Sequence, residues 1–180
     1  MTISKLSLRG GLHAVIRPAT PEDAAEVLAF FEQVAAESDY LPFGAGEYGR
    51  NLEQQAEQLR AHQDPAHGVM LGSWIGPELA GLVGIHRLQR PRIRHRAQLG
   101  VSVLRKYWAH GLGRALCEAA IVEARRIGLS RIDLHVRADN TRAIALYEAL
   151  GFVVEGRLRG AFKVGDVDYD DILMALHLHT

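Results

Sequence analysis

The alternation between apolar and polar positions is clearest over residues 96–122, where its period changes along the chain. Leu99, Val101 and Val103 fall on one side of an extended segment, which predicts a strand over 96–104. Farther on, apolar side chains recur three and four positions apart and so predict a helix with one apolar face. That face consists of Leu112, Ala115, Leu116, Ala119 and Val122. Gly111 and Gly113 stand where the strand gives way to the helix.

The same two periods recur along the rest of the chain. Alternating or continuous apolar runs predict strands at 13–17, 69–75, 79–88, 131–137, 152–156 and 170–176. Helical spacing and end signals predict a helix that begins at 20–23 and runs to about 36, and others at 51–61 and 143–150. In the first helix, the predicted core positions are Ala24, Val27, Leu28, Phe31, Val34 and Ala35. The order of elements predicts an α+β, or mixed α/β, fold with one twisted, mostly antiparallel sheet of about seven strands flanked by about four helices.

Length, charge and cysteine content narrow the class of protein. With 180 residues, the chain fits a single domain over 1–180. Basic and acidic residues number 21 each, so no overall field attracts nucleic acid or a membrane, and neither is an expected partner. The one cysteine, Cys117, rules out an internal disulfide and favours a reducing compartment. Since no apolar run reaches the roughly 18 residues of a membrane span, we expect a cytoplasmic protein.

Gly111 and Gly113 indicate an anion site at the start of the predicted helix. Without Cβ atoms the backbone can approach a ligand closely, and the first N–H groups of a helix lack carbonyl partners and lie at the positive end of its dipole. Phosphate is the typical ligand of such a turn. The spacing matches neither the dinucleotide-binding pattern, which would need glycine at Leu116, nor the P-loop. A tight turn without any ligand is the alternative.

Two segments resemble motifs of the GNAT N-acetyltransferase superfamily. Residues 101–103 and 107–116 are similar to its acetyl-CoA motif, although Trp108 stands where that family usually has Gln or Arg. Residues 140–152, NTRAIALYEALGF, are similar to its N-x-x-A-x-x-L-Y-x-x-x-G-F segment. The resemblance implies a GNAT-like domain that uses acetyl-CoA as cosubstrate and no metal.

The same resemblance implies direct transfer of the acetyl group to a primary amine. The acceptor would be a polyamine, a protein N-terminus or a small xenobiotic amine. A homodimer is a possible assembly. A noncatalytic domain of the same fold that binds CoA or RNA is the alternative.

The resemblance also implies roles for individual residues. Backbone groups of Val101, Ser102 and Val103 would hold the pantetheine and the thioester carbonyl. The pyrophosphate would lie on the turn made by Trp108, Ala109, His110, Gly111, Leu112, Gly113 and Arg114. Asn140 would hold the pantetheine arm, cap the helix that follows it, or do both. Tyr147 would contact acetyl-CoA and protonate the departing thiolate, or only pack in the core.

The general base is not identified by these motifs. Gln98 stands where related sequences often have a carboxylate, so the candidates are His95 and Glu37, with Asp39 as a further one. For each of them, a solvated surface position is the alternative.

Charged segments add two hypotheses. Acidic residues at 37–47 and 166–171 predict an electronegative rim that attracts cationic amines. Arginines at 90, 92, 94 and 96 would share one face of an extended segment, which is the best case for RNA, against a solvated hairpin end. The nine histidines are scattered, so no metal site is expected.

Overall fold

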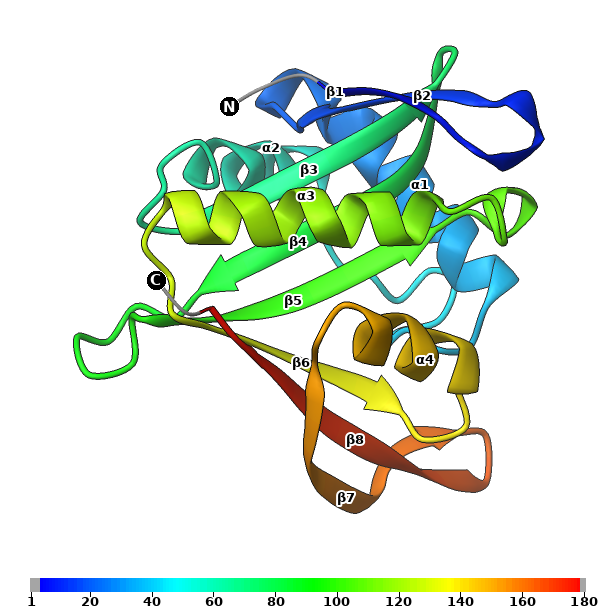
Figure 1. Cartoon of the computed structure of the whole chain (residues 1–180). Helices are drawn as coiled ribbons and strands as arrows, with labels where there is room; N and C mark the ends of the chain where they lie inside the picture. Colours follow the sequence, from blue (N-terminus) through cyan, green and yellow to red (C-terminus); the bar gives the residue numbers. More distant parts are fainter. Residues whose placement is uncertain (1–3, 179–180) are drawn as a thin grey trace.

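Residues 4–178 are described by a computed structural model, which contains one eight-stranded sheet and four α-helices (Figure 1). In chain order the strands are β1 (Ser4–Ser7), β2 (His13–Pro18), β3 (Gly68–Ile75), β4 (Glu78–Arg87), β5 (Arg96–Val103), β6 (Arg131–Arg137), β7 (Val153–Val164) and β8 (Val167–His177). Their order across the sheet is β1-β2-β3-β4-β5-β6-β8-β7. Neighbouring strands are antiparallel except β5 and β6, which are parallel.

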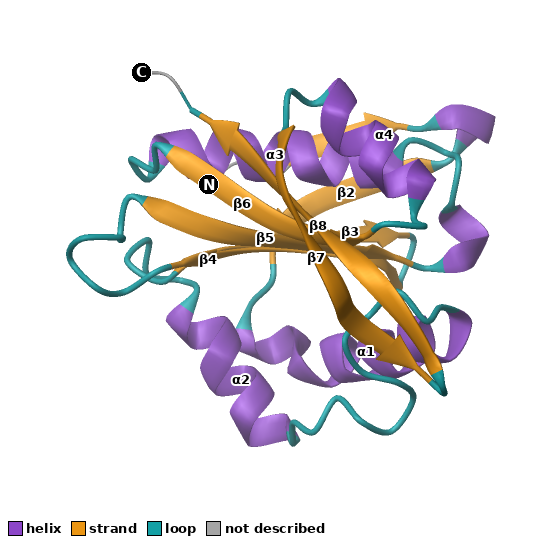
Figure 2. Cartoon of the chain, turned by 90° about the horizontal axis from the view of Figure 1, so that it is seen from below, coloured by secondary structure: helices purple, strands orange, loops and turns teal. Residues whose placement is uncertain are grey.

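The helices cover the sheet in two layers (Figure 2). On one face lie α3 (Leu112–Arg126) and α4 (Thr141–Ala149), and on the other lie α1 (Ala24–Glu37) and α2 (Leu52–Ala61). Short 3₁₀ turns, η1 (Arg9–Gly11), η2 (Pro21–Asp23) and η3 (Arg105–Tyr107), join some of these elements. Each layer has its own apolar core, the larger one being under α3. The mixed α/β class predicted from the sequence is therefore confirmed.

Helix α1 begins where the end signals predicted, but three of its predicted core positions, Leu28, Phe31 and Ala35, are only half-buried. Thr20 and Asp23 form a reciprocal capping box around Pro21, which fixes the start. The buried residues of α1 include Phe30, which is 3% exposed, whereas Phe31 is only partly buried. Phe31 instead stacks on Tyr48 in the segment before α2, with ring centroids 4.4 Å apart.

The predicted apolar face of α3 is wrong at Val122, which is 60% exposed. Each helical residue turns by about 100°, so ten residues after Leu112 the side chain has rotated away from the sheet. The buried positions are Leu112, Leu116, Cys117, Ala120, Ile121 and Ala124. Burial, with a small contribution from Glu118, raises the pKa of the Cys117 thiol to about 12, so it stays protonated and packs as an apolar side chain.

Strand β1 and the outer half of the β7–β8 hairpin were not predicted. All residues of β7 are exposed or half-buried because it lies at the edge of the sheet, so its sequence lacks the apolar alternation of a covered strand. The arginine strip is a second difference: residues 91–95 form turns, and Arg96 pairs with Asp133 at 2.7 Å, so the four arginines do not line one extended face. None of the helices described is long and apolar enough to cross a membrane.

Candidate active site

The parallel strands β5 and β6 separate along their length (Figure 1). They pair only at Arg96–Gln98 with Arg131–Asp133, although β5 continues to Val103 and β6 to Arg137. Beyond this point β5 stays paired with β4, and β6 stays paired with β8. One edge of each strand therefore has backbone groups that face no other strand. The result is a V-shaped opening in the sheet that widens toward the carboxyl ends of both strands.

The glycine turn lies at the wide end of this opening, between β5 and α3. Gly111 has a φ of 90°, and Ala109, with a φ of 66°, is the non-glycine residue with positive φ among residues 4–178. Trp108 Nε1 donates a hydrogen bond to the carbonyl oxygen of Val103 at 2.7 Å, and His110 Nδ1 donates to that of Trp108 at 2.9 Å. These bonds fold the turn back onto the end of β5.

The start of α3 is open to a ligand. The N–H groups of Leu112, Gly113 and Arg114 have no acceptor within the helix, because no helical turn precedes them. Within the described chain no side chain caps this helix either. A Cβ on Gly113 would lie 3.7 Å from Leu146 of α4 and 3.9 Å from Val103, so the turn is also where α3, α4 and β5 meet. The backbone here fits an anionic group such as a pyrophosphate.

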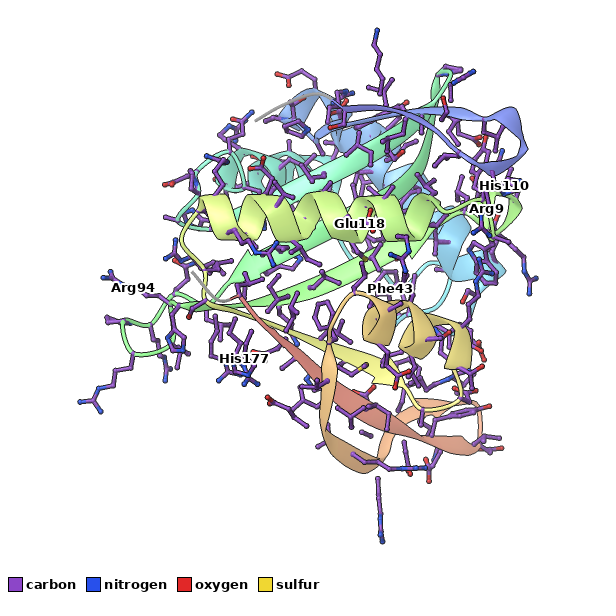
Figure 3. The ribbon with its side chains drawn as sticks, viewed as in Figure 1. Arg9, Phe43, Arg94, His110, Glu118 and His177 are labelled. Carbon is purple, nitrogen blue, oxygen red and sulfur yellow. The ribbon has the colours of Figure 1, made fainter. Side chains whose placement is uncertain are left out.

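Cationic side chains surround the turn. The guanidinium of Arg142 lies 5.1 Å from the ring of Trp108, and that of Arg105 lies 5.5 Å from it. The 3₁₀ turn η1 reaches the same place, because the backbone N–H of Arg9 donates to the carbonyl of His110 at 3.2 Å (Figure 3). The positive charge of these groups favours a phosphate-bearing ligand.

Asn140 directly precedes α4, the helix beside the opening (Figure 1), and Tyr147 lies on that helix. Asn140 caps the helix by accepting a hydrogen bond from the N–H of Ala143 at 3.2 Å, which is the alternative role considered for it. Tyr147 is 7% exposed and packs edge-on against Phe152 with ring centroids 5.8 Å apart. Burial raises the pKa of Tyr147 above its ordinary value, with a smaller effect of Cys117. Its hydroxyl is therefore protonated at neutral pH, as a proton donor must be.

Glu37 lies near the turn but its carboxylate is already bound. It accepts a hydrogen bond from the backbone N–H of Arg105 at 2.6 Å and another from Gln33 Nε2 at 2.9 Å. Through the first bond, the end of α1 holds η3 in place. This geometry suits a positioning residue better than a general base.

His95 lies at the opposite end of β5, which does not agree with its predicted role as a base. Its carbonyl accepts a hydrogen bond from the N–H of Ser130, just after the C-terminus of α3. The glycine turn is at the N-terminus of that helix, whose 15 residues span about 22 Å. Figure 3 labels the neighbouring Arg94 at one edge of the molecule and His110 at the other. We therefore do not place His95 in the site.

Arg137, at the end of β6, is a site-forming residue that the sequence analysis missed. Its side chain is 4% exposed, and it binds Asp139 at 2.7 Å and the backbone carbonyl of Asp39 at 3.0 Å. Its guanidinium lies 4.3 Å from the ring of Tyr40 and 4.0 Å from that of Tyr169. Arg137 thus joins the segment after α1 to the β7–β8 hairpin across the wide end of the opening. An isolated arginine in a predicted strand gave no signal of this.

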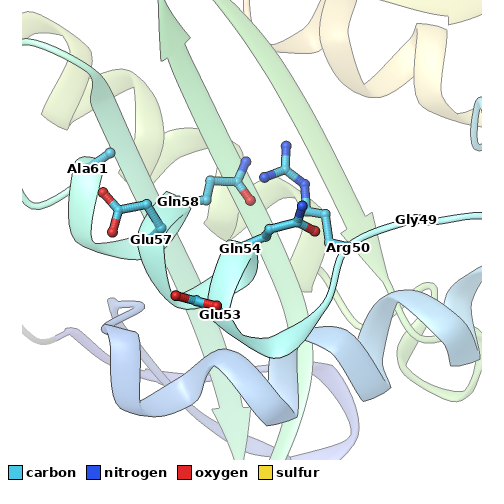
Figure 4. Close-up of a pocket in the computed structure, with 7 residues that line it drawn as sticks. All are labelled: Gly49, Arg50, Glu53, Gln54, Glu57, Gln58 and Ala61. Carbon is cyan, nitrogen blue, oxygen red and sulfur yellow. The ribbon is translucent and has the colours of Figure 1, made fainter.

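A separate depression lies over α2 and the residues before it (Figure 4). It is lined by Arg50, Glu53, Gln54 and Glu57, among others, and contains neither the glycine turn nor Tyr147. The glycine turn and Tyr147 therefore lie outside this depression.

An open pair of parallel strands that leads to an uncapped helix start defines a site for an extended ligand with phosphate at one end. The family model described as the acetyltransferase (GNAT) family matches residues 30–152. This chain therefore belongs to the GNAT acetyltransferase family.

Individual relatives agree with this assignment. An Escherichia coli (strain K12) ribosomal protein bS18-alanine N-acetyltransferase is 43% identical over 76 residues, which are 42% of this chain and 51% of the relative. The chain thus spans about half the length of this curated relative. A GNAT-family acetyltransferase structure from Streptococcus pneumoniae has a TM-score of 0.89 and 31% identity, covering 92% of this chain and 99% of its own. A Salmonella typhimurium structure, described as an acetyltransferase with its cofactor acetyl-CoA, has the same fold, with a TM-score of 0.82, 19% identity and coverage of 100% and 96%.

Proposed function

We propose that this chain transfers an acetyl group from acetyl-CoA directly to a primary amine. The main support for this proposal is the opening between β5 and β6, which ends at the uncapped start of α3. An extended ligand with a pyrophosphate at one end and a thioester at the other suits such an opening. Membership of the GNAT family supports the same reaction. A cytoplasmic location and a homodimer remain predictions.

Different residues along the opening would bind different parts of acetyl-CoA. Acetyl-CoA supplies the activated acyl group as a thioester. The free edge of β5 at Val101, Ser102 and Val103 would bind the pantetheine and the thioester carbonyl through backbone groups. The turn from Trp108 to Arg114 would bind the pyrophosphate. Asn140 would orient the pantetheine arm while it caps α4, and Tyr147 would give a proton to the departing thiolate.

A cationic amine is the proposed acceptor. Near the opening, Glu32, Glu37 and Glu47 accept hydrogen bonds from the backbone N–H groups of Gly46, Arg105 and Gly44, which leave their negative charge in place. The rim predicted at 166–171 contributes less, because Asp170 binds Arg157 at 2.6 Å and Asp168 lies 3.9 Å from Lys163. The charge around the acceptor would therefore come mainly from α1 and the segment after it.

The test is consumption of acetyl-CoA in the presence of a panel of amines. The panel contains a peptide with N-terminal alanine, chosen because the E. coli relative is named for an alanine, together with spermidine and an aminoglycoside. We expect turnover with at least one of them, and a kcat/KM that falls as ionic strength rises, since salt screens the attraction between acidic groups and a cation. Binding of acetyl-CoA without turnover of any amine would favour the noncatalytic domain instead.

A further inference from the structure

Strand β6 presents one open side chain in a mostly buried surface. Ile132, Leu134 and Val136 point into the core under α3 and α4. The alternate residues point to the other face of the sheet, where Arg137 meets Tyr40 from the segment after α1. Among these, Asp133 and Arg137 are buried, whereas the side chain of His135 is 40% exposed. His135 is therefore the residue of this strand that an acceptor can reach.

His135 is oriented by a carboxylate on the neighbouring strand. Its Nδ1 lies 2.8 Å from Oδ2 of Asp171 on β8, whose side chain is 15% exposed. A carboxylate accepts hydrogen bonds, so Nδ1 carries the hydrogen and the neutral ring has its lone pair on Nε2. Within residues 4–178, Nε2 of His135 has no hydrogen-bond partner. The ring is thus fixed in the tautomer that can accept a proton from a ligand.

The position of His135 along β6 places it where the sheet opens. The last pair between β5 and β6 is Gln98 with Asp133, and His135 is the next residue on the same face. Tyr147 lies on the opposite face, in the core with α3 and α4. A thioester held in the opening would therefore have the hydroxyl of Tyr147 on one side and Nε2 of His135 on the other.

One charged neighbour of His135 has no other ionic partner among residues 4–178. Asp133, two residues before it, binds Arg96 and Arg131 at 2.7 and 2.6 Å. Arg137, two residues after it, binds Asp139 and Asp39. These neighbours are largely compensated. Asp171 has no cation other than His135 among the described residues, so its charge is available to a ring that gains a proton.

We propose that His135, oriented by Asp171, is the general base that takes a proton from the acceptor amine. The inference rests on the proposed acetyl transfer. The ammonium gives one proton to Nε2 of His135, and the nitrogen lone pair forms the C–N bond with the thioester carbon. As the C–S bond breaks, the thiolate takes the proton of the Tyr147 hydroxyl, and the second proton leaving the nitrogen restores that hydroxyl through water. His135 then releases its proton to solvent, so one proton is produced for each acetyl group transferred.

The experiment compares the pH dependence of kcat/KM in the parent chain, His135→Gln and Asp171→Asn, with the best amine of the panel above. We expect kcat/KM of His135→Gln to be at least a hundredfold lower at pH 7 and the deficit to shrink above pH 9, where more of the amine is already the free base. Asp171→Asn should show a smaller deficit, and the KM for acetyl-CoA should not change. His67→Gln is the matched control, because His67 is an exposed histidine that lies 3.9 Å from Asp64.

Two results would overturn the assignment while leaving the proposed function intact. One is turnover by His135→Gln within threefold of the parent at pH 7. The other is a deficit that does not vary with pH, since a merely structural role would act equally at every pH. Long-range ¹H–¹⁵N NMR of the imidazole gives a readout without an acceptor: hydrogen on Nε2 instead of Nδ1 of His135 would also contradict the proposal. If no amine is turned over by the parent, the proposed function and this base fail together.

Discussion

The indole of Trp108 closes the glycine turn by donating a hydrogen bond to the carbonyl oxygen of Val103 over 2.7 Å. This bond ties the segment before α3 to the last residue of β5, so the two parts of the proposed acetyl-CoA site hold each other in position. Trp108, which stands where related sequences usually have Gln or Arg, therefore has a structural role of its own.

Replacing Trp108 by Phe should weaken acetyl-CoA binding without unfolding the protein. The Phe ring keeps the apolar contacts and the face near Arg142, but the hydrogen bond to Val103 is lost. A hydrogen bond of this kind is worth about 1 kcal/mol, or roughly a fivefold rise in the Kd for acetyl-CoA. Calorimetric titration of the folded variant checks this, and an unchanged Kd would mean that the turn keeps its shape without the indole N–H.

Replacing Gly111 by Ala should reduce both stability and acetyl-CoA affinity. The φ of 90° at Gly111 costs an L residue about 1–2 kcal/mol, and relief of that strain would move the N–H groups that follow. We expect acetyl-CoA binding to weaken at least tenfold, about 1.4 kcal/mol.

Gly128 supplies the matched control for Gly111. It has a φ of 75° at the far end of α3, and like Gly111 it has open space where a Cβ would lie. Gly128→Ala should therefore lose a similar amount of stability in urea unfolding but keep its affinity for acetyl-CoA. Equal losses of affinity in the two variants would show that the effect is general destabilisation and not the turn.

Replacing Tyr147 by Phe should lower kcat at least thirtyfold while the KM for acetyl-CoA stays nearly unchanged. The ring keeps its packing against Phe152, and only the proton donor to the thiolate is removed. Loss of a general acid usually lowers the rate by about 10²- to 10⁴-fold. We expect the low end of this range or somewhat less, because a thiolate is a good leaving group. Tyr48→Phe is the control, since it removes a half-buried hydroxyl that binds Gln55 at 2.8 Å. A kcat of Tyr147→Phe within threefold of the parent would assign the tyrosine to the core alone.

The stability of the fold should fall in mild acid because of His86. Burial, aided by the neighbouring charges of His62 and Arg50, lowers the pKa of His86 to about 4. In the unfolded chain a histidine takes up its proton near pH 6.5, so the unfolded state binds more protons between these values. The contribution of His86 is complete above about pH 6.5 and is lost as the pH falls toward about 4.

Urea unfolding at pH 7.5 and pH 5 measures this effect. The free energy of unfolding of the parent should fall by about 2 kcal/mol more than that of His86→Gln over this interval. The His62–His86 hydrogen bond of 3.0 Å requires a neutral His62, because His62 Nδ1 donates to the carbonyl of Gln58 and its Nε2 must accept from His86 Nδ1. Equal losses of stability in the parent and the variant would assign the acid sensitivity to other groups.

The sequence located those parts of the site whose signals are local. Gly111 reports a backbone conformation, and the segment from Asn140 to Phe152 carries its helix cap, apolar face and stop within a few residues, so both could be recognised without knowing the fold. The strands buried on both faces were predictable for the same reason. Exposed edge strands such as β7 were only partly predictable, since no core selects their side chains.

Contacts between distant residues could not be predicted in this way. Arg137 meets Asp39 across 98 positions of the chain, and His135 meets Asp171 across 36. Both pairs depend on which strand lies beside β6, and the insertion of β8 between β6 and β7 has no local signal. The search for a base therefore found His95, which is close in sequence to β5 but lies at its other end.

An NMR titration of the ¹⁵N-labelled protein with acetyl-CoA tests most directly where the cosubstrate binds. We expect the largest amide shifts at residues 101–103 and 111–114, along the free edge of β5 and the start of α3. Amides around the depression over α2, at Arg50 and Glu53, should not change. Shifts concentrated at α2, or no shifts at millimolar acetyl-CoA, would contradict the placement of the cosubstrate between β5 and β6.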